Sequence, residues 1–173
     1  MQEDSFEIHV MTESEAAAVC GWSYEPPYDI YGWMPWEEMK KLGIEFGDPE
    51  LRTQQYVTGY RNGVFCGFAQ LFPLGGTTRL GIGMRPDLCG RGMGAAFVRA
   101  AADEALRRIP GQEIDLEVLT WNQRAISAYR KAGFSITDLY ERMTPDGMKP
   151  FYCMVYQAPE SSALSAEGVE PAE

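Results

Sequence analysis

The stretch that decides the fold reads LGIGMRPDLCGRGMGAAFVRAAADEA and occupies residues 80–105. It predicts a short apolar strand and, after a proline, an alanine-rich helix with apolar residues at helical spacing. Gly90, Gly92 and Gly94 lie between the two elements. Because glycines have no side chain, the backbone N–H groups here are accessible. They lie at the start of the helix, where the unpaired N–H donors and the positive end of the helix dipole point in the same direction. The stretch therefore predicts a cradle for a phosphate or pyrophosphate group.

Two other interpretations of these glycines stay open from this segment alone. In the first, the glycines only allow the chain to turn from strand to helix. Against this, each spaced glycine costs backbone entropy on folding. The second is the dinucleotide fingerprint G-x-G-x-x-G/A, which residues 90–95 formally fit. That fingerprint begins as its strand ends, whereas residues 85–89 intervene here, so the context fits it poorly.

Length and composition limit the classes of protein to consider. A chain of 173 residues, 45% of them hydrophobic, is long enough for one domain with a full core and short for two. The start MQEDSFE lacks the features of a secretion signal, no apolar run approaches a membrane span, and the four cysteines are scattered. We therefore expect a cytoplasmic protein without a membrane partner. The net charge of −10 disfavours nucleic acid and favours a cationic partner such as an amine.

The rest of the chain predicts alternating strands and helices around the central stretch. Thr12 and Glu15 form a capping-box signature, and Asn62-Gly63 is a strong hairpin signal. The sequence predicts strands at 6–11, 54–60, 64–72, 77–84, 114–119, 134–140 and 151–156, and helices following residue 12 and at 35–42, 94–108 and 122–133. Strand, helix and strand within 77–119 imply a parallel pair with a right-handed crossover. The acidic segment 158–173 is expected to be disordered, leaving 1–157 as a single domain.

One loop carries more aromatic surface than loops usually do. Residues 22–33 read WSYEPPYDIYGW, with five large aromatic side chains around Pro26-Pro27. Such a segment either packs on its own domain or faces a ligand, and both interpretations stay open.

A second motif lies in residues 122–134, which read NQRAISAYRKAGF. Asn122, Ala125 and Tyr129 are spaced at i, i+3 and i+7, so they share one face of a helix. Alone, each has an ordinary explanation as a cap, a packing residue or a half-buried aromatic. Together with the glycine cradle one strand earlier, they resemble the GNAT superfamily of N-acetyltransferases over residues 6–157. The chain departs from the family at Cys89, where its acetyl-CoA loop usually begins with Gln or Arg.

The resemblance implies an α/β (α+β) fold: a mixed, mostly antiparallel sheet with a central parallel strand–helix–strand unit and flanking helices. It implies transfer of an acetyl group from acetyl-CoA to a primary amine of a small molecule or peptide, with no metal. Residues 91–95 would hold the pyrophosphate, and residues 82–84 would pair with the pantetheine arm like an added strand. The full cofactor set is Ile82, Gly83, Met84, Cys89, Gly90, Arg91, Gly92, Met93, Gly94, Ala95, Asn122, Ala125 and Tyr129.

The acetyl transfer that the resemblance implies requires two proton transfers. The ammonium group of an acceptor must lose a proton before it attacks, and the departing thiolate must gain one. Tyr129 would protonate the thiolate, and an N–H of Ile82 or Gly83 would bind the oxyanion. No carboxylate lies in strand 77–84, where many family members place a Glu. Glu117 is our first candidate for the base, with Glu25, Asp29 and a water chain as alternatives.

The resemblance implies that the aromatic loop lies beside the acceptor pocket and forms one wall of it, where its aromatic faces would attract a cation. Its candidate residues are Tyr24, Tyr28, Asp29, Tyr31 and Trp33. A non-catalytic acyl-CoA sensor on the same fold is the rival from another class, and a nucleotide-dependent oxidoreductase is a weaker third. The sequence names neither the acceptor nor the oligomer, and a homodimer stays open.

Overall fold

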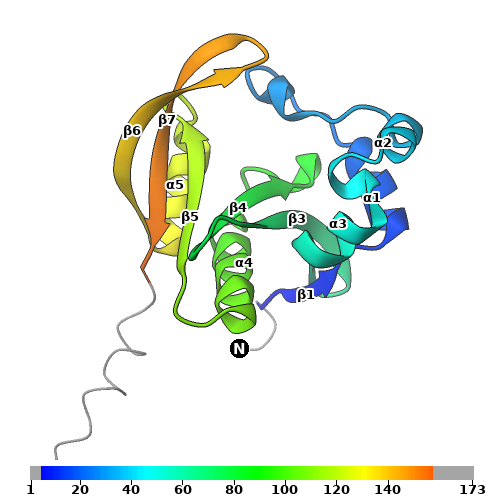
Figure 1. The fold of residues 1–173 in the computed structure, drawn as a ribbon, viewed down its shortest axis with the longest axis horizontal. Helices are drawn as coiled ribbons and strands as arrows, with labels where there is room; N and C mark the ends of the chain where they lie inside the picture. Colours follow the sequence, from blue (N-terminus) through cyan, green and yellow to red (C-terminus); the bar gives the residue numbers. More distant parts are fainter. Residues whose placement is uncertain (1–4, 158–173) are drawn as a thin grey trace, which may run out of the picture.

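The computed structural model describes residues 5–157, and the segment 158–173, predicted to be disordered, lies outside them. A seven-stranded sheet has the order β1-β2-β3-β4-β5-β7-β6 (Figure 1). The strands are β1 (Glu7–Val10), β2 (Tyr56–Arg61), β3 (Val64–Pro73), β4 (Thr77–Met84), β5 (Glu113–Leu119), β6 (Phe134–Thr144) and β7 (Gly147–Tyr156). The α-helices are α1 (Glu13–Cys20), α2 (Trp36–Leu42), α3 (Pro49–Gln55), α4 (Gly94–Arg108) and α5 (Gln123–Ala132), with short 3-10 helices η1 (Tyr28–Tyr31), η2 (Glu45–Gly47) and η3 (Pro86–Leu88).

All neighbouring strands are antiparallel except β4 and β5, which are parallel and joined by α4. The mixed, mostly antiparallel fold with a central parallel unit is therefore confirmed. Within the described residues, no helix combines the length and the apolarity needed to cross a bilayer.

Two apolar clusters cover opposite faces of the sheet. Tyr56 and Val57 are neighbours on β2, yet they belong to different clusters, because successive strand side chains point to opposite faces. The face with Val57 carries α4 and α5, whose buried residues include Phe97 and Ile126. The face with Tyr56 carries α1 and α2, together with Phe46 of η2. The two clusters fix the helices on either side of the sheet.

Several local signals form as predicted. Thr12 and Glu15 make the reciprocal hydrogen bonds of a capping box at the start of α1. Asn62 and Gly63 adopt φ values of 52° and 76°, the left-handed pair that a two-residue hairpin requires. Other predictions were wrong. The chain forms α3, which was not predicted, and the predicted strand 54–60 begins only at Tyr56, because Gln54 and Gln55 belong to that helix. β6 and β7 extend past residues 140 and 151 into a longer hairpin.

The parallel strands separate after a short ladder. Pairing runs only from Thr77 opposite Glu113 to Leu80 opposite Leu116. Beyond this ladder β4 pairs with β3 alone and β5 with β7 alone. The edges of Gly81–Met84 and Glu117–Leu119 consequently face each other without pairing, and we call this region the fork.

Candidate functional site

The glycine cradle lies at the start of α4, next to the end of β4. Gly90 and Gly92 have φ values of 76° and 79°, a backbone conformation that other residues rarely adopt. A Cβ atom added at either glycine would meet no heavy atom within 4 Å, so the surrounding space is open. The N-cap residue Met93 makes no side-chain cap, and the first turn of α4 contains no acidic residue.

The cradle thus leaves the N-terminal N–H groups of α4 without side-chain acceptors. Such groups, with the helix dipole behind them, suit a phosphate ligand. The residues present therefore fit a pyrophosphate group. Cys89, at the departure from the family pattern, turns back toward the end of β4, because its thiol is weakly bonded to the carbonyls of Arg85 at 3.7 Å and Met84 at 3.9 Å.

The open edge of β4 is set by strand alternation. The N–H of Arg85 donates to the carbonyl of Cys66 at 2.8 Å and so faces β3. Backbone groups of adjacent residues in an antiparallel strand point to opposite sides, so those of Met84 face the fork, as do those of Ile82. These groups are the ones an added strand would pair with.

The opposite side of the fork is formed by the start of α5. Asn122 is 6% exposed, and its side-chain oxygen accepts from the N–H of Ala125 at 3.1 Å, which confirms its predicted role as a cap. Tyr129 is half-buried, and its ring packs against Phe134 with 6.3 Å between centroids. Burial raises the pKa of the Tyr129 hydroxyl above the ordinary tyrosine value, so it stays protonated at neutral pH.

The aromatic segment reaches the fork from the other half of the molecule. The Tyr24 hydroxyl donates to the carbonyl of Met84 at 2.6 Å, and the amide of Asn122 donates to the Tyr31 hydroxyl oxygen at 3.0 Å. Trp33 instead packs against Phe46, with 4.7 Å between ring centroids. The segment therefore combines both interpretations of the sequence, because part of it is anchored in the core and part lies at the fork.

A broad groove of about 870 Å³ lies beside the fork, on the face opposite α4. Its polar lining includes Arg79 of β4, Glu117 of β5, and Tyr140, Glu141 and Arg142 of β6. Phe72 and Leu74 contribute an apolar wall, and Gln70, Leu80 and Gly81 complete the lining. The groove thus joins the base of the fork, where the β4–β5 ladder ends, to a surface of mixed charge.

Glu117 is the centre of an ion-pair network in this groove. Its side chain is 8% exposed, and its Oε1 accepts from Arg79 at 3.0 Å and from Arg142 at 2.5 Å. Burial and a hydrogen bond to Glu117 raise the pKa of the Tyr140 hydroxyl. Of the three carboxylates predicted as candidate bases, only Glu117 lines the groove; Glu25 and Asp29 are exposed.

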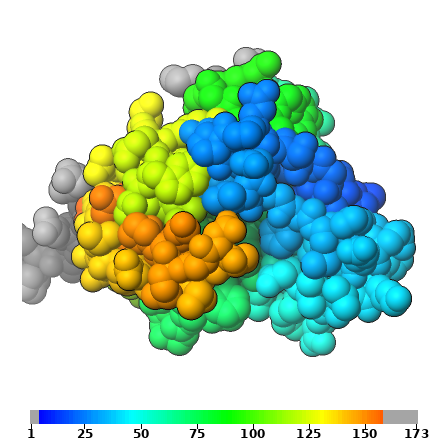
Figure 2. All heavy atoms as spheres, turned by 90° about the horizontal axis from the view of Figure 1, so that it is seen from above, coloured from blue at the N-terminus to red at the C-terminus, as the bar shows by residue number. Residues whose placement is uncertain are grey.

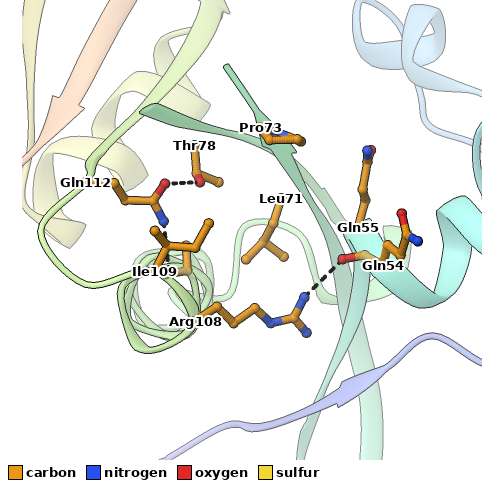
Figure 3. A pocket seen from close by; sticks show the side chains of 9 residues that line it. Gln54, Gln55, Leu71, Pro73, Thr78, Arg108, Ile109 and Gln112 are labelled. Carbon is orange, nitrogen blue, oxygen red and sulfur yellow. Dashed lines mark hydrogen bonds between the residues drawn. The ribbon is translucent and has the colours of Figure 1, made fainter. Parts of the chain in front are cut away.

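A smaller cavity of about 160 Å³ lies at the other end of β4, between α3 and the end of α4 (Figure 3). Its polar groups bond to one another. Thr78 donates to the side-chain oxygen of Gln112 at 2.5 Å, and Arg108 donates to the carbonyl of Gln54 at 3.2 Å. This internal bonding favours a structural role. Within residues 5–157, no three His, Cys, Asp or Glu side chains are grouped as metal ligands would be.

The structure thus brings the predicted cofactor residues, Tyr129, Glu117 and three loop tyrosines to the fork and its groove. Arg79 and Arg142 of the groove, and Trp121 beside Tyr28, were not predicted. Arg79 had a usable signal, because it is a charged residue within a central strand, on the face opposite Thr78 and Leu80.

Comparisons with known proteins agree with this arrangement. Residues 10–134 match the sequence model of the acetyltransferase (GNAT) family. A search of curated proteins finds no match. Among solved structures, a spermidine N-acetyltransferase SpeG chimera from Vibrio cholerae and hSSAT superposes with a TM-score of 0.71 at 14% identity, covering 92% of this chain and 98% of that chain.

Two further structures extend the comparison. An AAC(6')-Ib structure in complex with paromomycin and acetyl-CoA gives a TM-score of 0.67 at 22% identity, covering 96% and 99% of the two chains. The ribosomal-protein-S18-alanine N-acetyltransferase from Escherichia coli gives 0.59 at 20% identity, with the same coverage. At such identities these likenesses show the fold.

Proposed function

Because this chain belongs to the GNAT acetyltransferase family, and is thus an acyltransferase, we propose that it moves an acetyl group from acetyl-CoA to a primary amine of a small molecule or peptide. The observation that carries the proposal is the fork: a phosphate cradle, an open strand edge and the half-buried Tyr129 lie around one gap in the sheet. The four cysteines are free, which fits the predicted cytoplasmic setting.

The chain's own groups would hold acetyl-CoA along the fork. The N–H groups of residues 91–95 would bind the pyrophosphate, and the backbone of Ile82 and Met84 would pair with the pantetheine arm. Asn122 would donate its side-chain N–H to the same arm. The N–H of Ile82, at the open β4 edge, would stabilise the negative charge that develops on the thioester oxygen, whereas the N–H of Gly83 faces β3 by the same alternation.

Tyr129 would supply a proton to the leaving sulfur. Its hydroxyl has no hydrogen-bond partner among residues 5–157, so the proton is available for a ligand. A thiolate leaves more readily when an acid protonates it, and positioned acids contribute about 10²–10⁴ in rate. Direct attack of the amine then needs no covalent enzyme intermediate.

The groove beside the fork would receive the amine. Glu117 would accept the proton of the incoming ammonium group, with Arg79 and Arg142 fixing the carboxylate in place. Glu141 lines the groove, and no ion pair of this carboxylate is found in the described part of the chain. It would therefore attract a cationic acceptor. A role of Asp29 and the loop aromatics toward the acceptor stays a prediction.

The function is tested by mixing the protein with acetyl-CoA and a panel of amines, and by detecting released CoA with a thiol reagent. The panel contains amino acids, polyamines, aminoglycosides and peptide N-termini. We expect CoA release to depend on one class of amine and to yield the acetylated amine by mass spectrometry. Tight binding of acetyl-CoA without release for any amine would favour the sensor, and absence of binding would reject the proposal.

A further inference from the structure

The segment from Tyr24 to Tyr31 is tied to both sides of the fork. On the β4 side, the Tyr24 hydroxyl donates to the carbonyl of Met84 at 2.6 Å. On the α5 side, the Tyr31 hydroxyl accepts from the side-chain amide of Asn122 at 3.0 Å. These two bonds join positions that are 60 and 91 residues apart in the chain. A single short segment thus spans the gap between the two halves of the sheet.

Aromatic contacts strengthen the attachment on the α5 side. The ring of Tyr28 lies 5.8 Å from that of Trp121, and the guanidinium of Arg124 lies 3.7 Å above the Tyr28 ring. The ring of Tyr31 is 6.5 Å from the same tryptophan. In Figures 1 and 2 the 3-10 helix η1 (blue) also lies beside the tip of the β6–β7 hairpin (orange). The segment therefore covers the outer end of the fork.

The two polar groups that the tyrosines occupy are the ones a ligand in the fork would need. The carbonyl of Met84 points into the fork because Arg85, its neighbour, bonds to β3. In Asn122, the side-chain oxygen is already engaged with the N–H of Ala125, so its NH₂ group is what remains for a ligand. One tyrosine hydroxyl contacts each group. The bonds of the closed segment therefore coincide with those proposed for the pantetheine arm.

We propose that Tyr24 and Tyr31 form a latch that closes the fork in the unliganded protein and releases when the pantetheine arm of acetyl-CoA binds. This inference rests on the proposed function, because it takes the fork to be the acetyl-CoA site. A ligand that binds only the open form has its apparent affinity reduced in proportion to the open fraction. Weakening the latch therefore raises the affinity, whereas weakening a mere structural contact does not.

The latch is tested by removing one hydroxyl at a time. Tyr24→Phe and Tyr31→Phe keep the rings and delete one latch bond each. Since one hydrogen bond changes an equilibrium by about two- to tenfold, each variant should bind acetyl-CoA with a Kd lower by that factor, mainly through faster association. Tyr60→Phe is the matched control, because its hydroxyl bonds to Glu15 on the β1–β2 side of the molecule. Its Kd should equal that of the parent.

Calorimetry and stopped-flow association with acetyl-CoA separate the possible outcomes. Lower Kd values for the two latch variants, with an unchanged control, support the latch. Parent-like or weaker binding by both variants overturns the latch but leaves the proposed function intact, because acetyl-CoA still binds. If neither the parent nor any variant binds acetyl-CoA, the proposed function fails and the latch fails with it.

Hydrogen exchange of the parent protein tests the same idea without a variant. The N–H of Tyr28 bonds to the carbonyl of Glu25 at 2.8 Å within the closed segment and serves as a reporter. Acetyl-CoA should speed exchange in residues 25–33 while it slows exchange in residues 91–95. Slowed exchange in the cradle together with unchanged or slower exchange in residues 25–33 contradicts the latch alone.

Discussion

Arg79 clamps Asp115 across the parallel strands at the base of the fork. Its Nε and Nη2 atoms donate to the two carboxylate oxygens of Asp115 at 3.0 and 2.9 Å. The two residues are register partners one position before the last pair of the ladder, Leu80 and Leu116. The hydrogen bonds to Asp115 raise the pKa of Arg79, although its burial opposes this. The fork thus begins at a charged crosslink between β4 and β5.

Replacing Arg79 with Met should destabilise the fold, because the Asp115 side chain is only 8% exposed and would lose its cation. Hydrogen bonds to charged groups contribute about 1.5–3 kcal/mol, and we expect the free energy of unfolding in urea to fall by that amount. Arg107→Met is the control, since Arg107 pairs with Glu104 while 72% exposed and such pairs contribute about 0–1 kcal/mol. Equal losses in the two variants would contradict the clamp.

Gly92→Val should abolish tight binding of acetyl-CoA, because the new side chain would fill the space proposed for the pyrophosphate. We expect the Kd from calorimetry to rise at least about tenfold, equivalent to roughly 1.4 kcal/mol. Gly75→Val is matched for backbone strain, because Gly75 also has a positive φ and open space but lies in the β3–β4 turn. If both variants weaken binding equally, backbone strain rather than the cradle is responsible.

Tyr129→Phe should lower kcat by about 10²–10⁴ with little change in acetyl-CoA affinity, because it removes only the proton donor. Burial raises the pKa of Tyr129 above the ordinary tyrosine value, so the protonated, active form persists past the pH where a free tyrosine ionises. The parent should therefore show no loss of kcat from this group between pH 6 and about 9. Unchanged turnover in the variant, with chemistry rate-limiting, would assign Tyr129 to packing.

Glu117→Gln should lower kcat/KM for the amine by about 10²–10⁴, mainly through kcat, because the base is lost. Glu141→Gln changes a carboxylate that lines the same groove and is proposed only to attract the amine. It should raise the KM for the amine and keep the parent's kcat. A Glu117→Gln enzyme that unfolds normally yet retains the parent's kcat would move the base elsewhere, to water or to the loop carboxylates.

Local turn chemistry is the part of the fold that could be predicted from the sequence. Thr12 and Asn122 each accept a hydrogen bond from a backbone N–H three residues on, and Asn62 adopts the positive φ of its own turn, so each signal is complete in a short window. The same kind of signal existed for α3, where Asp48 caps the helix and Pro49 begins it. This helix was missed because it runs directly into β2 at Tyr56, without a closing glycine such as Gly43, which marks the end of the equally short α2.

The candidate site was predictable only where its residues belong to one motif. The cradle and the Asn122–Tyr129 face are local in sequence, so their placement followed from the motifs. Tyr24 and Tyr31 contact Met84 and Asn122, which are far from them in the chain. A local sequence pattern cannot predict such contacts. The fork exists because β4 and β5 diverge after the pair Leu80 and Leu116. The residue types along the two strands do not show where this divergence begins.

The short ladder has a consequence for how the chain can be divided. In the described part of the chain it is the only strand pairing between β1–β4 and β5–β7, and each of these halves is antiparallel within itself. The chain crosses between them once, through α4 and an exposed turn at Gly111. A cut at this turn would place the cradle on one fragment and Tyr129 with Glu117 on the other. Acetyl transfer would then require complementation in trans, and would report the reunion of the two fragments.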